Sequence, residues 1–189
     1  ILGSLFSKLR LKNKPVGIDI EIYKDRDKRI DFQKIDVIKY LKKNKKKFDL
    51  ILIKQTIHLL KFQQIKKLLL LCNGALNPKG KIMIFTLETF NNEIPTFLLM
   101  KKKLRKSLIR DKKIIQYISK LHTKNSIKKF SFKVTITKKK YIKMIKNRYI
   151  STLLNFNLKE ISHGINEIKS KYSQTIHFDD KLICLILNK

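Results

Sequence analysis

The stretch from Phe48 to Glu88 constrains the fold more than any other part of the chain, because it contains two apolar strands separated by an amphipathic helix. Its first part, FDLILI, is an almost unbroken apolar run, which is typical of a strand covered on both faces. The segment KFQQIKKLLLLC then changes to helical spacing. One side of that helix carries Phe62, Ile65, Leu69 and Cys72.

A turn and a second strand complete this unit. The turn is Asn77-Pro78-Lys79-Gly80, in which Pro presets φ and Gly permits a positive φ. KIMIFTL follows as another apolar strand. The order of strand, helix and strand predicts a right-handed βαβ unit within a parallel sheet.

The residues before this unit supply further short elements. Residues 1–11 have apolar side chains at helical spacing, and Pro15 ends that helix. VGIDI is a short apolar strand, RIDFQKI is a weaker one, and each ends in or next to an acid. A short helix is expected over 37–44.

The residues after Glu88 change to a mainly helical pattern. The segment LLMKKKLRKSLIRDKKIIQYISKL predicts a long basic helix, and FSFKVTI alternates as a half-exposed strand. Thr137 is placed to cap the next helix, and Asn157 with Glu160 forms a capping box for another. IHFDDKLICLIL predicts a terminal strand preceded by a tight turn at Asp179-Asp180.

These elements together predict an α/β protein with a mostly parallel sheet, an antiparallel last strand and a helical lid insertion. We expect residues 1–88 to form a partial core, 89–175 a helical lid with one strand, and 176–189 a C-terminal strand that completes the core sheet.

The charge of the chain is extreme, at +31 from 45 Lys and Arg against 14 Asp and Glu. Such a charge is typical of nucleic-acid-binding proteins. However, only six of the 45 basic residues are arginines, whereas phosphate-reading surfaces favour the bidentate guanidinium. The abundance of Ile, Asn, Phe and Lys also fits compositional drift in AT-rich codons. We favour drift and keep nucleic-acid binding as the alternative.

Other classes are poorly supported by the sequence. No apolar run approaches the roughly 18 residues that span a bilayer, and no signal peptide is evident. Cys72 and Cys184 both lie in apolar segments, so neither a disulfide framework nor a metal site is indicated. A cytoplasmic protein is the expectation.

Polar residues that follow the predicted strands are the candidates for a binding site. Ligands of open parallel sheets bind beyond the carboxyl ends of the strands. Asp19, Asp36, the segment 54–58 and the segment 86–88 occupy those positions. A carboxylate has two oxygens side by side and can therefore accept both hydroxyls of a ribose. The alternative is that Asp19 and Asp36 are helix-cap or turn residues.

The order GIDIE, FQKIDVIKYL, FDLILIKQTIHLL and LNPKGKIMIFTLE resembles the class I S-adenosylmethionine-dependent methyltransferases of the type 11 group. The pairs Phe48-Asp49 and Ile57-His58 fit the family's central strand and the residues after it. Leu76, Pro78 and Gly80 match the L-x-P-G-G segment before its fifth strand, with Lys79 replacing the first Gly. The resemblance covers residues 1–88 firmly and the remainder more loosely.

The resemblance implies S-adenosyl-L-methionine as cofactor, methyl transfer to a small acceptor, and no metal. Asp19 would bind the ribose hydroxyls and Asp36 the adenine amine. The residues packing on adenine or lining the cofactor would be Ile20, Val37, Lys54 and Gln55, and those facing the substrate would be Thr56, Arg148 and Tyr149. Alternatively, Tyr149 belongs with Tyr141 and Tyr172 to the core of the lid. His58 would be a general base, because histidine is readily poised near neutral pH. Alternatively, His58 packs under the next helix.

One departure from the family concerns its acidic-x-Gly-x-Gly-x-Gly loop, which the sequence does not contain. The chain also begins with Ile. We therefore expect a fragment whose first strand and glycine loop lie upstream of Ile1, with an incomplete cofactor cradle. The alternative function from another class is a lysine-rich nucleic-acid-binding module, with an RNA methyltransferase as an intermediate case.

Overall fold

A computed structural model describes residues 7–8, 10–21 and 27–189. The helix expected over residues 1–11 falls largely outside the described residues. Among the described helices, none is both long and apolar enough to cross a membrane.

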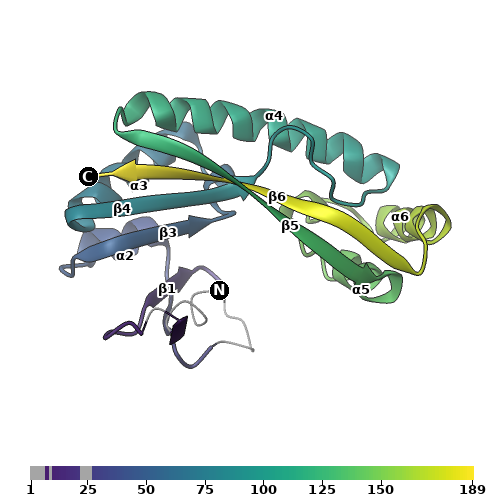
Figure 1. Ribbon diagram of the computed structural model, residues 1–189, viewed down its shortest axis with the longest axis horizontal. Coiled ribbons are helices and arrows are strands. Elements are labelled where there is room, and N and C mark those ends of the chain that lie inside the picture. The colour runs from purple at the N-terminus through teal and green to yellow at the C-terminus, as the bar shows by residue number, and fades with distance from the viewer. Residues whose placement is uncertain (1–6, 9, 22–26) are drawn as a thin grey trace.

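The main sheet has four strands in the order β3-β4-β6-β5 (Figure 1). Its members are β3 (Phe48–Lys54), β4 (Leu76–Leu87), β6 (Thr175–Asn188) and β5 (Asn125–Thr137). β3 and β4 are parallel, whereas β6 runs antiparallel to both of its neighbours. The predicted α/β class and the antiparallel last strand are therefore confirmed.

A separate sheet contains β1 (Val16–Asp19) and β2 (Asp31–Lys34), which pair in parallel. No described strand hydrogen-bonds to both β1 and β3. The sequence predicted these strands within one sheet, and the structure divides them between two.

The central βαβ unit is confirmed, since α3 (Phe62–Ala75) connects the parallel strands β3 and β4. Ile65, Leu69 and Cys72 are buried as expected, but the predicted burial of Phe62 is wrong, because its side chain is 43% exposed. The Phe62 ring lies edge-on to Tyr117, with the centroids 4.9 Å apart.

The expected turn at 77–80 is an irregular start of β4, where the register with β3 shifts. Lys79, and not Gly80, adopts the positive φ of 66°. Gly80 is required for a different reason, because a Cβ there would lie 2.9 Å from the Asn77 carbonyl oxygen.

The first hydrophobic cluster lies between the main sheet and three helices. It joins Leu41 of α2 (Val37–Lys43) and Ile65 of α3 to Ile114 of α4 (Leu98–Leu121). Ile84 of β4 and Leu185 of β6 complete the contact from the sheet. The bounds predicted for α4 agree with the structure, because this helix has strong apolar periodicity.

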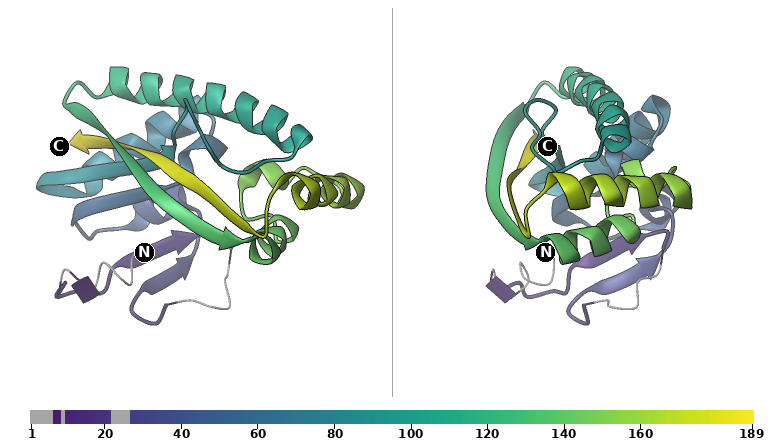
Figure 2. Two further views of the ribbon diagram at one scale, coloured as in Figure 1. Left: turned by 45° about the vertical axis from the view of Figure 1, so that its right-hand side comes forward. Right: turned by 90° about the vertical axis from the view of Figure 1, so that its right-hand side faces the viewer.

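The second cluster lies around α5 (Lys138–Lys146) and α6 (Leu158–Lys171), at the N-terminal end of β6 (Figure 2). The predicted caps are confirmed, since Thr137 Oγ1 accepts from Lys140 N and the capping box of α6 is complete. Gly164 lets α6 approach Phe97 closely. A Cβ on Gly164 would lie 2.6 Å from the Phe97 ring.

β6 continues through the expected turn at Asp179-Asp180, so that prediction is wrong. Asp179 pairs with Lys133 and Asp180 with Phe132 in the ladder to β5. The ladder supplies hydrogen-bond partners over the full strand and overrides the local turn preference.

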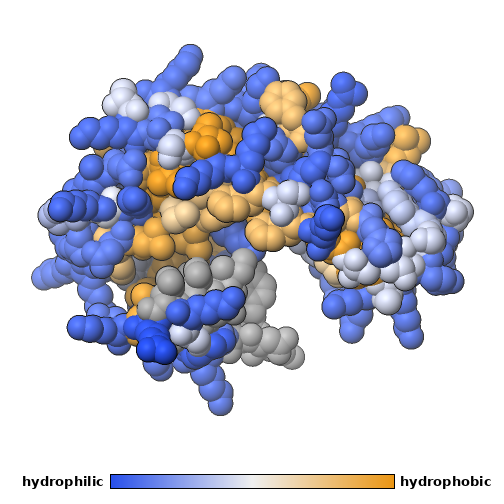
Figure 3. Space-filling model, viewed as in Figure 1, coloured by the Kyte–Doolittle hydropathy of each residue, from blue (hydrophilic) through white to orange (hydrophobic). Residues whose placement is uncertain are grey.

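The face of the main sheet opposite the first cluster is apolar; α5 and α6 cover it at the N-terminal end of β6, and apolar side chains on the rest of it are exposed. Its exposed members include Leu50, Phe130 and Phe132. Figure 3 shows apolar side chains forming a band across this face. Phe130 and Phe132 stack on each other, with ring centroids 6.5 Å apart.

Candidate active site

A pocket of about 140 Å³ lies beyond the carboxyl ends of β3 and β4, where ligands of open sheets bind. Four segments contribute to it: the residues after β3, the end of β4, the middle of α4, and the loop between α5 and α6. The lining residues are Gln55, His58, Thr86, Leu87, Leu104, Ser107, Asp111, Tyr149, Ile150, Ser151 and Thr152.

His58 occupies the short 3-10 helix η1 (Ile57–Leu59), and its side chain is half-buried. Its Nε2 lies 3.0 Å from Oγ of Ser151, which is 93 residues further along the chain in η2 (Ser151–Leu153). Burial lowers the pKa of the His58 imidazole below its ordinary value, and the charge of Asp111 opposes that shift. The positive charge of Arg110 lowers the pKa further. His58 is therefore neutral at pH 7 and able to accept a proton.

Asp111 is the acidic group of the pocket and is only 7% exposed. Its Oδ2 is 3.5 Å from Thr86 Oγ1, and its buried Oδ1 has no hydrogen-bond partner among the described residues. Burial raises the pKa of the Asp111 carboxyl, while the charges of His58 and Arg110 act to lower it. The carboxyl group and the imidazole thus influence each other electrostatically across one wall of the pocket.

Tyr149 lines the pocket, and its hydroxyl is fixed by a second tyrosine. Tyr141 OH donates to the Pro95 carbonyl at 2.5 Å and lies 2.8 Å from Tyr149 OH. Because the single proton of Tyr141 goes to Pro95, Tyr149 is the donor in the second bond. Burial raises the pKa of Tyr149 to about 12, so its hydroxyl remains protonated at neutral pH.

The other two predicted substrate residues make local contacts. Arg148 Nη1 donates to the carbonyl oxygens of Leu153 and Leu154 at 2.5 and 3.0 Å. It therefore holds η2, and with it Ser151, beside the pocket. Thr56 Oγ1 donates to the Lys54 carbonyl at 2.8 Å. The structure does not bring Arg148 or Thr56 into the pocket lining.

The predicted cofactor residues Asp19 and Asp36 follow the neighbouring strands β1 and β2. The backbone bond from Ile35 N to the Asp19 carbonyl, at 2.9 Å, links the two loops. Asp19 Oδ1 accepts from Glu21 N at 3.1 Å, and Asp36 Oδ1 accepts from Lys39 N as the N-cap of α2. Both acids therefore also have the local roles that the sequence left open.

The remaining predicted cofactor residues differ in exposure and position. Ile20 is 63% exposed beside Asp19, whereas Val37 packs against the first cluster. Gln55 adopts a positive φ of 49° and lines the pocket. Lys54 ends β3, and its charge acts to lower the pKa of Asp180, which burial raises. Gln55 is thus the member of this set that the structure places beside His58.

Two solved structures with a similar arrangement of strands and helices are described as methyltransferases. A protein of Anabaena variabilis, described as a methyltransferase from an antibiotic biosynthesis pathway, has a TM-score of 0.56 and 13% identity, covering 97% of this chain and 95% of that one. An SAM-dependent methyltransferase from Archaeoglobus fulgidus has a TM-score of 0.53 and 17% identity, covering 98% and 80%. The chain has the class I methyltransferase fold.

A third similar structure is the plantazolicin methyltransferase BpumL in complex with SAH and a triazolic desmethylPZN analogue. Its TM-score is 0.50 at 16% identity, covering 100% of this chain and 71% of that one. No protein-family model and no curated protein sequence matches the chain.

Within this methyltransferase fold, Asp111 and Ser151 are two pocket residues to which the sequence analysis gave no role in the site. Asp111 is the one acid in the 24-residue α4, and it shares a helical face with the buried Leu104, Ile114 and Ile118. An acid on the apolar face of a basic helix is the signal that could have identified it. Ser151 had no such signal, because its role depends on a contact with a distant residue.

Proposed function

We propose that the chain is an S-adenosylmethionine-dependent methyltransferase whose acceptor site is the pocket beside His58. The observation that carries this proposal is the position of the pocket, which lies beyond β3 and β4 in a methyltransferase fold. The sulfonium cofactor supplies an activated methyl group when bound. The side chains of the pocket orient the acceptor, exclude water and accept its proton, and such positioning accounts for much of the rate.

Cofactor binding is assigned to the loops that follow β1 and β2. Asp19 and Asp36 would accept the ribose hydroxyls and the adenine amine, and Ile20 would pack on the adenine. The residues present fit such a ligand, because Ile20 is an exposed apolar side chain next to a carboxylate. Lys54 and Gln55 would meet the cofactor on the side of the pocket. No group of three or more His, Cys, Asp or Glu within the described residues is arranged to bind a metal ion.

The substitution Asp36→Ser tests the cofactor assignment. Serine is also a good N-cap, so this change removes the carboxylate while preserving the start of α2. Loss of a charge-assisted bond to the adenine amine, worth ~1.5–3 kcal/mol, should weaken SAH binding about ten-fold or more in isothermal titration calorimetry. Asp49→Ser is a matched control at a carboxylate that accepts from Asn77 instead. Unchanged SAH affinity in Asp36→Ser would contradict the assignment.

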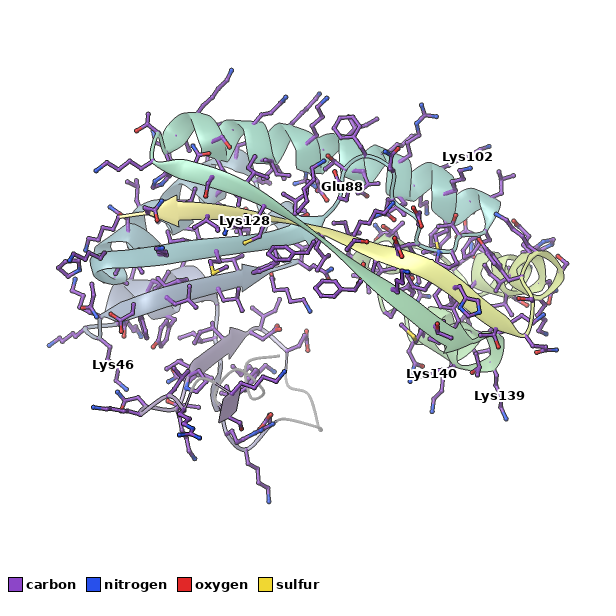
Figure 4. All side chains as sticks on the ribbon, viewed as in Figure 1. Lys46, Glu88, Lys102, Lys128, Lys139 and Lys140 are labelled. Carbon is purple, nitrogen blue, oxygen red and sulfur yellow. The ribbon has the colours of Figure 1, made fainter. Side chains whose placement is uncertain are left out.

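The nature of the acceptor belongs to the same proposal, with a small molecule favoured over a nucleic acid. Figure 4 shows Lys46 before β3, Lys102 on α4, Lys128 on β5, and Lys139 and Lys140 on α5, so the labelled lysines are spread over four segments of the molecule. A nucleic-acid reader concentrates its positive charge along one groove or face. The labelled lysines have no such arrangement.

A further inference from the structure

The pocket has an unusual charge for this protein. Lys and Arg account for 45 residues of the chain, yet none of those in the described part of the chain lines the pocket, whose described ionisable side chains are His58, Asp111 and Tyr149. Arg110 precedes Asp111, but its guanidinium donates to the Leu60 carbonyl at 3.2 Å. A carboxylate or phosphate acceptor would therefore enter a site with a buried acid and no lining cation among the residues that the structure describes, which is unfavourable.

The contact with Ser151 indicates that His58 Nε2 binds a hydroxyl group. The hydroxyl of Ser151 lies 3.0 Å from Nε2, at hydrogen-bond distance, and both residues line the pocket. The Ser151 hydroxyl therefore occupies the position from which an acceptor hydroxyl could give its proton to the imidazole. η2, which carries Ser151, is a short 3-10 helix held by Arg148 at the border of the second cluster.

The size and walls of the pocket limit the acceptor further. A volume of about 140 Å³ is close to the ~150 Å³ of an apolar cavity that binds benzene. Leu87, Leu104, Ile150 and the Tyr149 ring supply the apolar part of the pocket lining. The pocket thus matches a single six-membered ring that carries one hydroxyl.

We propose that the acceptor is a phenolic hydroxyl on a single ring, which replaces Ser151 at His58 Nε2, with Asp111 as the residue that stabilises the protonated imidazole. This inference rests on the proposed methyltransferase function and names the acceptor of the same site. The O–H bond of the phenol breaks as an N–H bond forms on His58 Nε2. The electron pair that stays on the oxygen then forms the O–CH₃ bond. The electrons of the S–CH₃ bond remain on sulfur, which leaves SAH neutral. His58 then releases its proton to water.

A phenol suits this base better than an aliphatic alcohol does. The pKa of a phenol is about 10, well below that of an alkanol. Transfer of the hydroxyl proton to a histidine at neutral pH is therefore far less unfavourable for a phenol than for an alkanol. The carboxylate of Asp111 favours the imidazolium, because its charge opposes the effect of burial on His58. Arg110 is the other charge that acts on His58, and its influence disfavours protonation.

Histidine-detected NMR on the full chain tests the acceptor class without cofactor. The probes are phenol and benzoate, which have similar rings and opposite charge states at pH 7. Phenol should shift the His58 ring resonances and bind about ten-fold more tightly than benzoate, since a buried charge without a partner is costly. The exposed His163 on α6 is the internal control and should not shift.

Three results would overturn the acceptor proposal: benzoate binding as tightly as phenol, phenol binding without a shift of His58, or no binding of either probe. SAH binding, measured separately by calorimetry, reports on the methyltransferase function. A chain that binds SAH but not phenol therefore refutes the acceptor proposal alone. A chain that binds phenol at His58 but not SAH refutes the proposed methyltransferase function, and with it the role of phenol as a methyl acceptor, while phenol recognition by His58 stands.

Variants separate the roles of the two partners of His58. Ser151→Ala removes the competing hydroxyl and should tighten phenol binding, whereas a purely structural Ser151 would leave it unchanged or weaker. Asp111→Asn should lower the pKa of His58 in an NMR pH titration, because the charge of Asp111 favours the imidazolium. His58→Gln should reduce transfer of a labelled methyl group to phenol about 10²-fold, against no loss in His163→Gln. An unaltered His58 titration in Asp111→Asn would refute the role of Asp111.

Discussion

At the scale of single residues, the two glycines in the described helices show how local packing decides whether an added methyl group stabilises or destabilises the fold. Gly74 in α3 has no atom within 4 Å of the position of a Cβ, whereas a Cβ on Gly164 in α6 would meet the Phe97 ring at 2.6 Å. Helix propensity favours Ala over Gly at both positions by ~0.5–1 kcal/mol. Any difference in stability between the alanine variants at Gly74 and Gly164 is therefore due to packing.

We predict opposite effects for the two alanine substitutions. Gly74→Ala should raise the free energy of unfolding by ~0.5–1 kcal/mol through helix propensity. Gly164→Ala should lower it by ~1–2 kcal/mol, because overpacking of the Phe97 contact exceeds the propensity gain. Urea unfolding followed by circular dichroism measures both. A stabilised Gly164→Ala would mean that Phe97 has room to move.

Residue-scale chemistry was also the hardest part to predict from the sequence. His58 was identified by its type and its position after a strand, and the structure places it in the pocket. Its contact with Ser151 was not predictable, because spacing within a sequence does not report contacts across 93 residues. Asp111 was missed because an acid in a basic helix is most simply explained as a solvated residue.

At the scale of elements, predictions from local sequence patterns were confirmed, whereas predictions of strand ends and turns that depend on strand pairing were wrong. The bounds of α4 and the caps of α5 and α6 follow from periodicity and from side chains within three residues. β5 was predicted from residue 130, but it begins at Asn125 because β6 extends the ladder. The same ladder converted the expected turn at Asp179-Asp180 into strand.

The capping box of α6 provides a test at this scale. Asn157 Oδ1 accepts from Glu160 N at 2.9 Å, and Glu160 Oε2 accepts from Asn157 N at 2.8 Å. Asn157→Ala should destabilise the protein by ~1 kcal/mol, whereas Asn157→Asp should retain most of the stability as an equally good cap. The measurement is the midpoint of chemical unfolding. Equal midpoints for Ala and Asp would show that the cap contributes little.

At the scale of the whole molecule, the charge of +31 influences every association. Exposed lysines lie on several elements and not on a single groove (Figure 4). The charge therefore predicts attraction to polyanions without a defined binding face.

The affinity for nucleic acid should accordingly fall as the salt concentration rises, and it should not depend on the nucleotide sequence. Fluorescence anisotropy with two unrelated RNA oligonucleotides should give equal affinities that fall steeply between 50 and 200 mM salt, as counterion release requires. Heparin should compete with both. A marked preference for one RNA that persists at high salt would instead favour the nucleic-acid alternative.

The path of β6 has a consequence for how the molecule opens. One face of its C-terminal half packs in the first cluster through Leu185 and Leu187, and the opposite face of its N-terminal half packs in the second through Ile176. If either cluster separates from β6, the strand loosens, and the hydrogen bonds of that strand also hold the half that packs in the other cluster. His58 follows β3, which pairs with β4 and through it with β6, and Leu153 beside Ser151 packs with Ile176 of β6, so a movement that separates the two walls of the pocket would also disturb the packing of the core.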